Sequence, residues 1–331
     1  MIFRYSSVGS TVYGYDLRNT SSPIIKDCDY ILDYLNGEEI NQISFANHSN
    51  KMHIATADDD GFTRISDNLP NRKSKDVNGQ SNNTNAAARR CKQLQHDEDG
   101  SALVTSVVFR PRNKDLELAT GGTDCTVCLW DVNRPRRPSS SLIIKRDDGE
   151  GVNQVCNPPI IHSLSWSPSG RLLAAGLGDG SAMIMQVEKR KLVEGCRLRG
   201  GHDSAIASVL FPNFGCDESS HMAAEDRLMV SGGNDGSIIL WDIGKKMASN
   251  AVDPSSMFAD CNNQTDGNAI DIDEAMNELS IGDDDPKILF GLRHGHKPNW
   301  IANSSHFDPV FSNSLFIADT SNDITAYRLP R

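Results

Sequence analysis

An eleven-residue phrase, GGNDGSIILWD at 232–242, recurs along this 331-residue chain with constant internal spacing. Around it, Ser231 stands four residues before Asp235, and Trp241 stands six residues after it. Near-copies with the same spacing are Thr120, Asp124 and Trp130; Ala175, Asp179 and Met185; and Thr56, Asp60 and Ser66. Self-similarity of this kind indicates an array of small repeated units, each of which must stack on its neighbours to bury both faces.

Each repeat predicts a small antiparallel sheet. In the unit with the clearest pattern, apolar residues at 205–211 predict an inner strand, and those at 228–231 and 237–241 predict the next two. The intervening 232–236 segment suits a tight turn, because Asn, Asp and Gly tolerate positive φ angles. The chain is therefore predicted to be all-β.

The Gly-His, turn-Asp and Trp-Asp elements resemble those of the WD-repeat family, and the resemblance extends over nearly the whole chain. It implies a β-propeller in which a Trp indole, a Ser or Thr hydroxyl, a His and the turn Asp form a hydrogen-bonded network. The two complete sets are His202, Ser231, Asp235 and Trp241, and His96, Thr120, Asp124 and Trp130. A Ser/His/Asp set also suggests a catalytic triad, but its recurrence with a Trp favours a structural role. Because Ala175 and Met185 replace two of these partners, Asp179 is expected to matter less than Asp235.

Six units can be counted from the ends of their third strands. These ends fall at Tyr15, Ser66, Trp130, Met185, Trp241 and Tyr327. Inner-strand patterns precede five of them, at 40–45, 105–109, 161–166, 205–211 and 300–304, whereas the first unit begins at its second strand. One interpretation is a six-bladed ring with an imperfect seam. We favour the other, in which six recognisable blade units belong to a seven-bladed ring and the first unit is incomplete.

Length and composition favour a single propeller over residues 1–331 with two insertions. The segment 68–100 is predicted to be flexible, either as a solvated loop or as a basic docking patch. The segment 245–287 is predicted to be disordered and acidic, because residues 248–286 hold ten Asp or Glu and no Lys or Arg. This segment supplies most of the net charge of −11.

Composition also indicates where the protein acts. No apolar run reaches the ~18 residues that span a bilayer, and the chain opens on a strand pattern rather than a signal peptide. Eight scattered cysteines then predict reduced thiols and a place in the cytoplasm or nucleus. No aromatic residues alternate with the basic ones, so direct binding to nucleic acid is not favoured.

No separate catalytic or metal site emerges from the sequence. Cys125 and Cys128 are the only closely spaced cysteines, and without a second pair they favour core packing over zinc binding. There is no P-loop, no GxSxG elbow and no HExxH motif. We therefore predict no enzyme activity, no cofactor and no metal.

One motif indicates a partner. Tyr15, Asp16 and Arg18 lie in a Tyr-Asp-Leu-Arg box that resembles the box with which WD-repeat substrate receptors bind the damaged-DNA-binding adaptor of cullin-4 ligases. The alternative is an ordinary strand end. Segments 38–41, 107–111, 232–236 and 297–300 also resemble, in the same order, a family branch linked to this ligase. The expected function is a non-enzymatic substrate receptor of a cullin-4 RING E3 ubiquitin ligase, with an unknown substrate; the alternative is a general scaffold or peptide-reading propeller without a ligase link.

Overall fold

The computed structural model describes most of the chain. The described residues are 3–16, 28–33, 37–67, 91–97, 99–146, 157–212, 226–244, 286–303, 314–321 and 323–328. All regular structure within them is β-strand, and no helix there is long and apolar enough to cross a membrane. Contacts divide the chain into two compact units, which we describe separately: 1–110 with 114–124 and 128–139, and 111–113 with 125–127 and 140–331.

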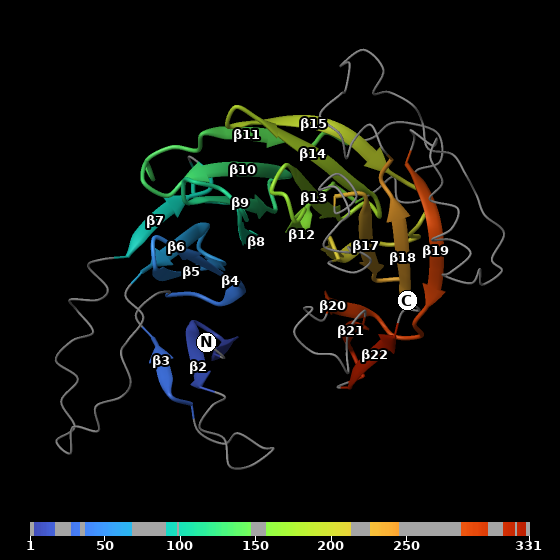
Figure 1. Ribbon diagram of the computed structural model, residues 1–331, viewed down its shortest axis with the longest axis horizontal. Helices are drawn as coiled ribbons and strands as arrows, with labels where there is room; N and C mark the ends of the chain where they lie inside the picture. The colour runs from blue at the N-terminus through green and yellow to red at the C-terminus, as the bar shows by residue number, and fades with distance from the viewer. Residues whose placement is uncertain are drawn as a thin grey trace. The chain divides into compact units, whose positions relative to one another are not determined.

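The first unit contains two complete sheets and begins a third (Figure 1). The first sheet consists of β1 (Phe3–Val8), β2 (Thr11–Asp16) and β3 (Tyr30–Leu32). The second consists of β4 (Ile40–His48), β5 (Lys51–Asp58), β6 (Phe62–Ser66) and β7 (Lys92–Gln95). The third runs from β8 (Val104–Phe109) through β9 (Glu117–Gly122) and β10 (Thr126–Asp131) to β11 (Ser140–Ile143), which belongs to the second unit.

The second unit contains three further sheets. One consists of β12 (Ile161–Trp166), β13 (Leu172–Leu177), β14 (Ala182–Glu188) and β15 (Lys191–Leu198). The next consists of β16 (Ile206–Leu210), β17 (Leu228–Gly233), β18 (Ser237–Asp242) and β19 (Lys287–Arg293). The last consists of β20 (Pro298–Asn303), β21 (Ser314–Asp319) and β22 (Ile324–Arg328).

All six sheets are meanders of consecutive strands, so the expectation of six blade units is confirmed. Among the described residues the first sheet shows no inner strand, as expected, because β1 pairs only with β2 and β2 ends at the Tyr-Asp position typical of a third strand. A seventh blade is not among the described residues and stays a prediction.

The outer strands were not anticipated, and one of them corrects the predicted insertion at 68–100. β7 pairs with β6 from Ile65↔Lys92 to Phe62↔Gln95, so residues 91–97 are part of the sheet. Leu94 is fully buried and packs in the same cluster as Trp130. This packing explains why the short segment pairs with β6 as a strand. Residues 68–90, and 245–285 of the predicted acidic insertion, lie outside the described residues.

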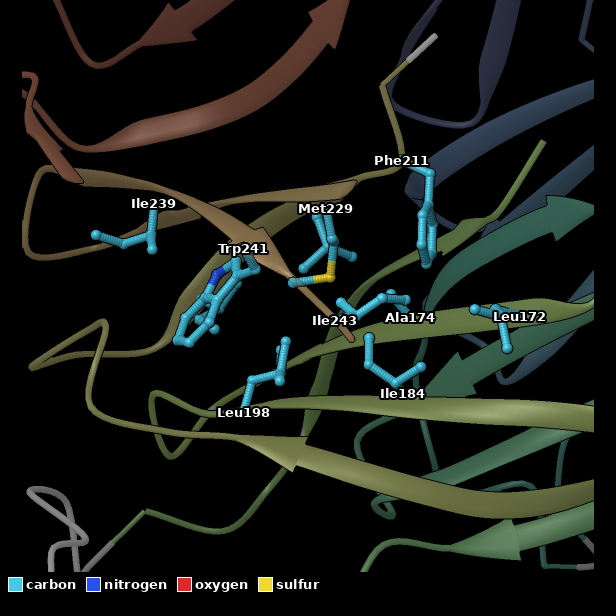
Figure 2. Close-up of a cluster of buried hydrophobic side chains, with 12 residues drawn as sticks. Leu172, Ala174, Ile184, Leu198, Phe211, Met229, Ile239, Trp241 and Ile243 are labelled. Atoms are coloured by element: carbon cyan, nitrogen blue, oxygen red, sulfur yellow. The ribbon is translucent and has the colours of Figure 1, made fainter. Parts of the chain in front are cut away.

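Apolar side chains fill the space between neighbouring sheets of one unit. Figure 2 shows the cluster between the β12–β15 and β16–β19 sheets, in which Ile184 and Met229 are fully buried and Trp241 is 2% exposed. Burying side chains of this size contributes about 1.5–3 kcal/mol each. Stacking of apolar sheet faces is therefore the main stabilising interaction in each unit.

Neighbouring inner strands are also tied by hydrogen bonds from backbone to side chain. In each case the acceptor follows a register shift near the start of its inner strand, and the donor is a backbone N–H of the next inner strand. The bonds run from Val107 N to Gln42 Oε1 (2.8 Å), from Val209 N to Ser163 Oγ (3.2 Å) and from Ile301 N to Ser208 Oγ (3.2 Å). These acceptors satisfy N–H groups that the sheet ladders leave unpaired.

The same register position in β20 holds Trp300, which follows the shift after Pro298. Its side chain cannot accept a backbone hydrogen bond as Ser or Gln does. Trp300 is 49% exposed, an unusual state for so large an apolar residue. The last sheet thus offers an aromatic surface where three other sheets offer a hydrogen-bond acceptor.

In four sheets the turn between the second and third strands has a positive φ angle directly after its Asp. Glycine supplies it at Gly61 (+80°), Gly180 (+85°) and Gly236 (+78°). Between β9 and β10 the position holds Cys125 at φ +64°. Residues with a Cβ lose about 1–2 kcal/mol in the left-handed region, so this turn is strained.

We expect Cys125→Gly to raise the free energy of unfolding by about 0.5–1 kcal/mol, since relief of strain exceeds the greater entropy loss of glycine. Chemical denaturation measures the change. Cys125→Ala is the matched control, because it removes the thiol but keeps the Cβ. A Cys125→Gly protein less stable than Cys125→Ala would contradict the strain.

Candidate functional site

His202 stands at the centre of the first predicted network. Its Nε2 lies 2.7 Å from Ser231 Oγ, to which Trp241 Nε1 donates at 2.7 Å, and its Nδ1 lies 3.5 Å from Asp235 Oδ1. Sequence reasoning missed Ser237, whose Oγ lies 2.7 Å from the same Nδ1 and 2.6 Å from Asp235 Oδ1. The four predicted residues are therefore brought together, with Ser237 as an additional member.

Hydrogen bonds keep the Asp235 carboxylate ionised. Burial alone would raise the pKa of Asp235, but hydrogen bonds from His202 and Ser237 outweigh it and hold the pKa well below its usual range. The backbone N–H groups of Asp203 and Ser237 donate at 2.8 and 2.9 Å. The carboxylate thus joins the turn to the loop that precedes β16.

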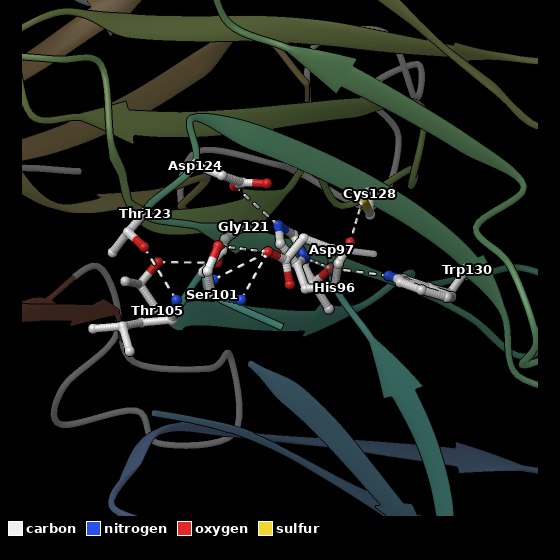
Figure 3. A network of polar contacts seen from close by, with 12 residues as sticks. His96, Asp97, Ser101, Thr105, Gly121, Thr123, Asp124, Cys128 and Trp130 are labelled. Carbon is white, nitrogen blue, oxygen red and sulfur yellow. Dashed lines mark hydrogen bonds and ion pairs between the residues drawn. The ribbon is translucent and has the colours of Figure 1, made fainter. Parts of the chain in front are cut away.

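The second predicted network joins the same kinds of residue around His96, but the two ring nitrogens exchange partners (Figure 3). His96 Nδ1 lies 2.9 Å from Thr120 Oγ1, and its Nε2 lies 3.3 Å from Asp124 Oδ1. Trp130 Nε1 donates to Thr120 Oγ1 at 2.9 Å. His96 directly follows β7, so the outer strand of one sheet delivers it to the turn of the next.

A third network surrounds His294. His294 occupies the position of the Gly-His element, and its Nε2 lies 2.7 Å from Asp319 Oδ2. Its Nδ1 lies 2.8 Å from Tyr327 Oη, so a phenol reaches the histidine directly and replaces the paired indole and hydroxyl. Ser321 N donates to Asp319 at 2.7 Å, as Ser237 N does to Asp235. The signal in the sequence was the Asp-x-Ser spacing shared by both turns.

The two turns without histidine use arginine, which corrects the expectation for Asp179. In the β12–β15 sheet, Arg197 of β15 pairs with the Asp179 carboxylate and donates from Nε to Ser181 Oγ at 2.8 Å. In the β4–β7 sheet, Arg64 donates to both oxygens of Asp60, at 3.1 and 2.8 Å. Asp179 has therefore not lost its partners: Arg197 comes from an outer strand that the sequence analysis did not assign.

These networks do not provide a nucleophile. Ser231 is fully buried and Thr120 is 1% exposed, so a substrate cannot reach either hydroxyl. Each hydroxyl also accepts an indole N–H. The arrangement fixes the distance between a turn, a loop and a strand, which is a structural task.

The described residues also show no group of three His, Cys, Asp or Glu side chains that suits a metal ion. Of the two closely spaced cysteines, Cys128 is buried, and burial raises its pKa to about 12. Its Sγ packs 3.9 Å from the His96 carbonyl oxygen. Cys128 thus packs as a small apolar side chain within the His96 network.

The predicted adaptor box is only partly within the described residues. Tyr15 and Asp16 end β2, where they pair with Arg4 and Phe3. Tyr15 is half-buried. Arg18 lies outside the described residues, so the structure describes only the first part of the box.

We expect Asp179→Ala to be at least as harmful as Asp235→Ala. The first leaves Arg197 charged with its side chain only 9% exposed, and breaking such a pair costs about 3 kcal/mol or more. The second removes one hydrogen-bonding partner of His202, at a cost of about 1–3 kcal/mol. Chemical denaturation of both variants tests the order.

The matched control is the double variant Asp179→Ala/Arg197→Met, which removes the stranded charge and should recover part of the lost stability. If Asp179→Ala is clearly milder than Asp235→Ala, the Arg197 pair does not act as described.

Asp319 should make stability depend on acid pH. Hydrogen bonds from Ser321, followed by the contact with His294, lower the pKa of Asp319 from 3.8 to about 2. A lowered pKa in the folded state means that the ionised group stabilises the fold at neutral pH, and this contribution is lost as pH falls from about 4 to about 2.

Asp319→Asn should therefore be less stable at pH 7 and lose less stability than wild type between pH 4 and pH 2. Thermal melts over this range measure the effect. Asp323→Asn, on the same hairpin but exposed, is the control. Parallel pH profiles for wild type and Asp319→Asn would rule out this role.

Comparison with known proteins agrees with the repeated geometry. The WD domain, G-beta repeat family model matches residues 89–131 and 195–242, which hold the His96 and His202 networks. The model of the anaphase-promoting complex subunit 4 WD40 domain matches residues 137–211.

Relatives extend the similarity to almost the whole chain. It is 26% identical over 334 aligned residues to the WD repeat-containing protein 53 homolog of Dictyostelium discoideum, covering 97% of this chain and 75% of that protein. It is 30% identical over 108 residues to the WD repeat-containing protein VIP3 of Arabidopsis thaliana, covering 33% of this chain and 32% of that protein. A chain in the crystal structure of the mitotic checkpoint complex shares the fold, with a TM-score of 0.59 at 14% identity over 99% of this chain and 72% of that chain. The repeated sheets, the matched WD-domain repeats and the similarity along 97% of the chain assign this protein to the WD-repeat family of β-propellers.

Proposed function

We propose that this WD-repeat protein is a non-enzymatic scaffold and acts as a substrate receptor of a cullin-4 RING E3 ubiquitin ligase. The WD-repeat fold supports the general role in binding other proteins. The observation that carries the specific role is that Tyr15 and Asp16 of the predicted box end β2, beside an exposed apolar face. Such a role places the protein in the cytoplasm or nucleus.

This face belongs to the first sheet. The registers Val8↔Thr11 and Tyr13↔Ile31 put these side chains on one face, and Tyr15 shares it because residues of a strand alternate between faces. Val8 is 68% exposed and Ile31 is 41% exposed. A half-buried Tyr next to exposed apolar residues is typical of the centre of a protein interface.

The opposite face of the first sheet is already used. Val12 and Leu32 are fully buried there and pack with Ile40 and Ile54 of the second sheet. The exposed face is therefore the one available to a partner. An adaptor that binds the box would cover Tyr15 and the neighbouring apolar residues together.

The two Trp-Asp strand ends use their carboxylates within the fold. Asp242, at the end of β18, is fully buried and accepts from Arg227 Nε and Nη2 at 2.7 and 2.6 Å. Asp131, at the end of β10, is 5% exposed and accepts the Asn133 N–H at 2.9 Å. These two carboxylates stabilise their own strand ends.

We expect Arg18→Ala to reduce recovery of the ligase adaptor in co-precipitation by about tenfold or more, because an arginine anchor at an interface is worth about 2 kcal/mol. Arg134→Ala is the matched control, since Arg134 is exposed and follows the Trp130-Asp131 strand end. Equal adaptor recovery with wild type and Arg18→Ala would remove the docking box from this proposal.

A general scaffold without a ligase link is the second candidate, and the last sheet favours it. Trp300, Phe316 and Ile324 share one face of β20–β22, by the registers Trp300↔Ala318, Phe316↔Ala326 and Ala318↔Ile324. Trp300 is 49% exposed and Ile324 is 72% exposed. Affinity purification separates the two candidates: under the second, the adaptor is missing from the wild-type sample, and Trp300→Ala depletes the proteins that are present.

A further inference from the structure

The loop between β10 and β11 concentrates positive charge directly before a serine. Residues 132–139 connect the two strands and contain Arg134, Arg136 and Arg137. Ser139 follows them, so the arginines stand at positions −5, −3 and −2 relative to its hydroxyl. No acidic residue occurs between Val132 and Ser139.

The three arginines are left out of the ion pairs that the fold forms elsewhere. Five other arginines pair with carboxylates inside the sheets: Arg64, Arg110, Arg171, Arg197 and Arg227. Arg134, Arg136 and Arg137 are all exposed, and none of their side chains pairs with a carboxylate in the described part of the chain. The fold therefore does not need these guanidinium groups, and they are available to another molecule.

Ser139 is held in place but its hydroxyl is free. Its backbone N–H donates to the Leu129 carbonyl oxygen at 2.7 Å, which anchors the end of the loop on β10. The residue is exposed, and its Oγ has no partner among the described residues. In contrast, the neighbouring Ser140 is half-buried and its Oγ accepts the Leu192 N–H at 3.1 Å. Of the two adjacent serines, only Ser139 presents an unoccupied hydroxyl.

Two prolines keep the basic segment out of the sheet. Pro135 and Pro138 have no N–H to donate to a ladder, and each disfavours helix in the residue before it. The segment between them forms turns and bends rather than a strand, and its arginines are exposed. Because it lies outside the strands, a kinase can reach it without opening the core.

We propose that Ser139 is a phosphorylation site for an arginine-directed serine/threonine kinase. Kinases of this class line the cleft with carboxylates that pair with guanidinium groups upstream of the acceptor, and such charge patterns determine the substrate. Ser139 Oγ attacks the γ-phosphorus of ATP, the bond from that phosphorus to the β–γ bridging oxygen breaks, and ADP leaves. The hydroxyl proton passes to the aspartate of the kinase catalytic loop.

The modification would change the charge of the loop. A phosphoserine carries about −1.5 to −2 at pH 7, so the net charge of 132–139 falls from +3 to about +1. The phosphate oxygens also become strong acceptors for the upstream arginines. Phosphorylation thus withdraws these guanidinium groups from any acidic partner that the unmodified loop attracts.

The folded full chain, incubated with the catalytic subunit of cyclic-AMP-dependent protein kinase and ATP, provides the test. Tandem mass spectrometry should place phosphate on Ser139, and Ser139→Ala should abolish that modified peptide. Arg136→Gln/Arg137→Gln should lower kcat/KM for Ser139 about tenfold or more, because both charge-assisted contacts are lost.

Ser140→Ala is the matched control and should leave labelling of Ser139 unchanged. Circular dichroism melts confirm that each variant is folded, which is expected because the substituted arginines are exposed. Phosphate on Ser140 instead of Ser139, labelling of Ser139 that is insensitive to the arginine substitutions, or labelling that appears only after heat denaturation would each overturn the proposal.

Discussion

In five of the six sheets, a carboxylate in the turn between two strands accepts hydrogen bonds from a donor side chain, and at Asp179 and Asp319 this carboxylate is buried. The pairs are Asp60 with Arg64, Asp124 with His96, Asp179 with Arg197, Asp235 with His202 and Asp319 with His294. In the three histidine pairs the donor lies between an outer strand and the next inner strand, so the pair also sets where the next strand begins. At the two buried sites, removing the donor would cost far more stability than the pair gains over water.

The same task is carried out by different side chains. Histidine works with a hydroxyl and an indole in two sheets and with a single phenol in a third, whereas arginine satisfies the carboxylate without an aromatic residue. Met185 is fully buried at the position that Trp occupies in other sheets. Packing in the β12–β15 sheet therefore does not need an indole N–H at this position. The spacing of the turn is thus maintained while its chemistry varies.

Much of this was readable from the sequence, and what was missed has a physical cause. The inner strand at 161–166 matches β12, and the predicted strands at 228–231 and 237–241 lie within β17 and β18, because these strands are buried and apolar on a regular pattern. The outer strands lack that pattern: β7 buries only Leu94, and β11 buries no residue completely. Arg197 belongs to such a strand, so the partner of Asp179 could not be found by local spacing. The hydroxyl-to-histidine distances depend on pairing between strands about 30 residues apart, which propensity alone does not determine.

Trp300 gives the last sheet a different kind of boundary. In three sheets, a backbone N–H of the next inner strand donates to Gln42, Ser163 or Ser208. If the two strands separate, that N–H and its acceptor lose their hydrogen bond. An element that covers Trp300 meets only an aromatic surface at that point, so its departure exposes apolar area but breaks no such bond. Binding of another element at Trp300 therefore depends on shape complementarity and on the burial of apolar surface, not on a hydrogen bond that fixes the strand register. This makes the face of the last sheet the one best suited to reversible contacts.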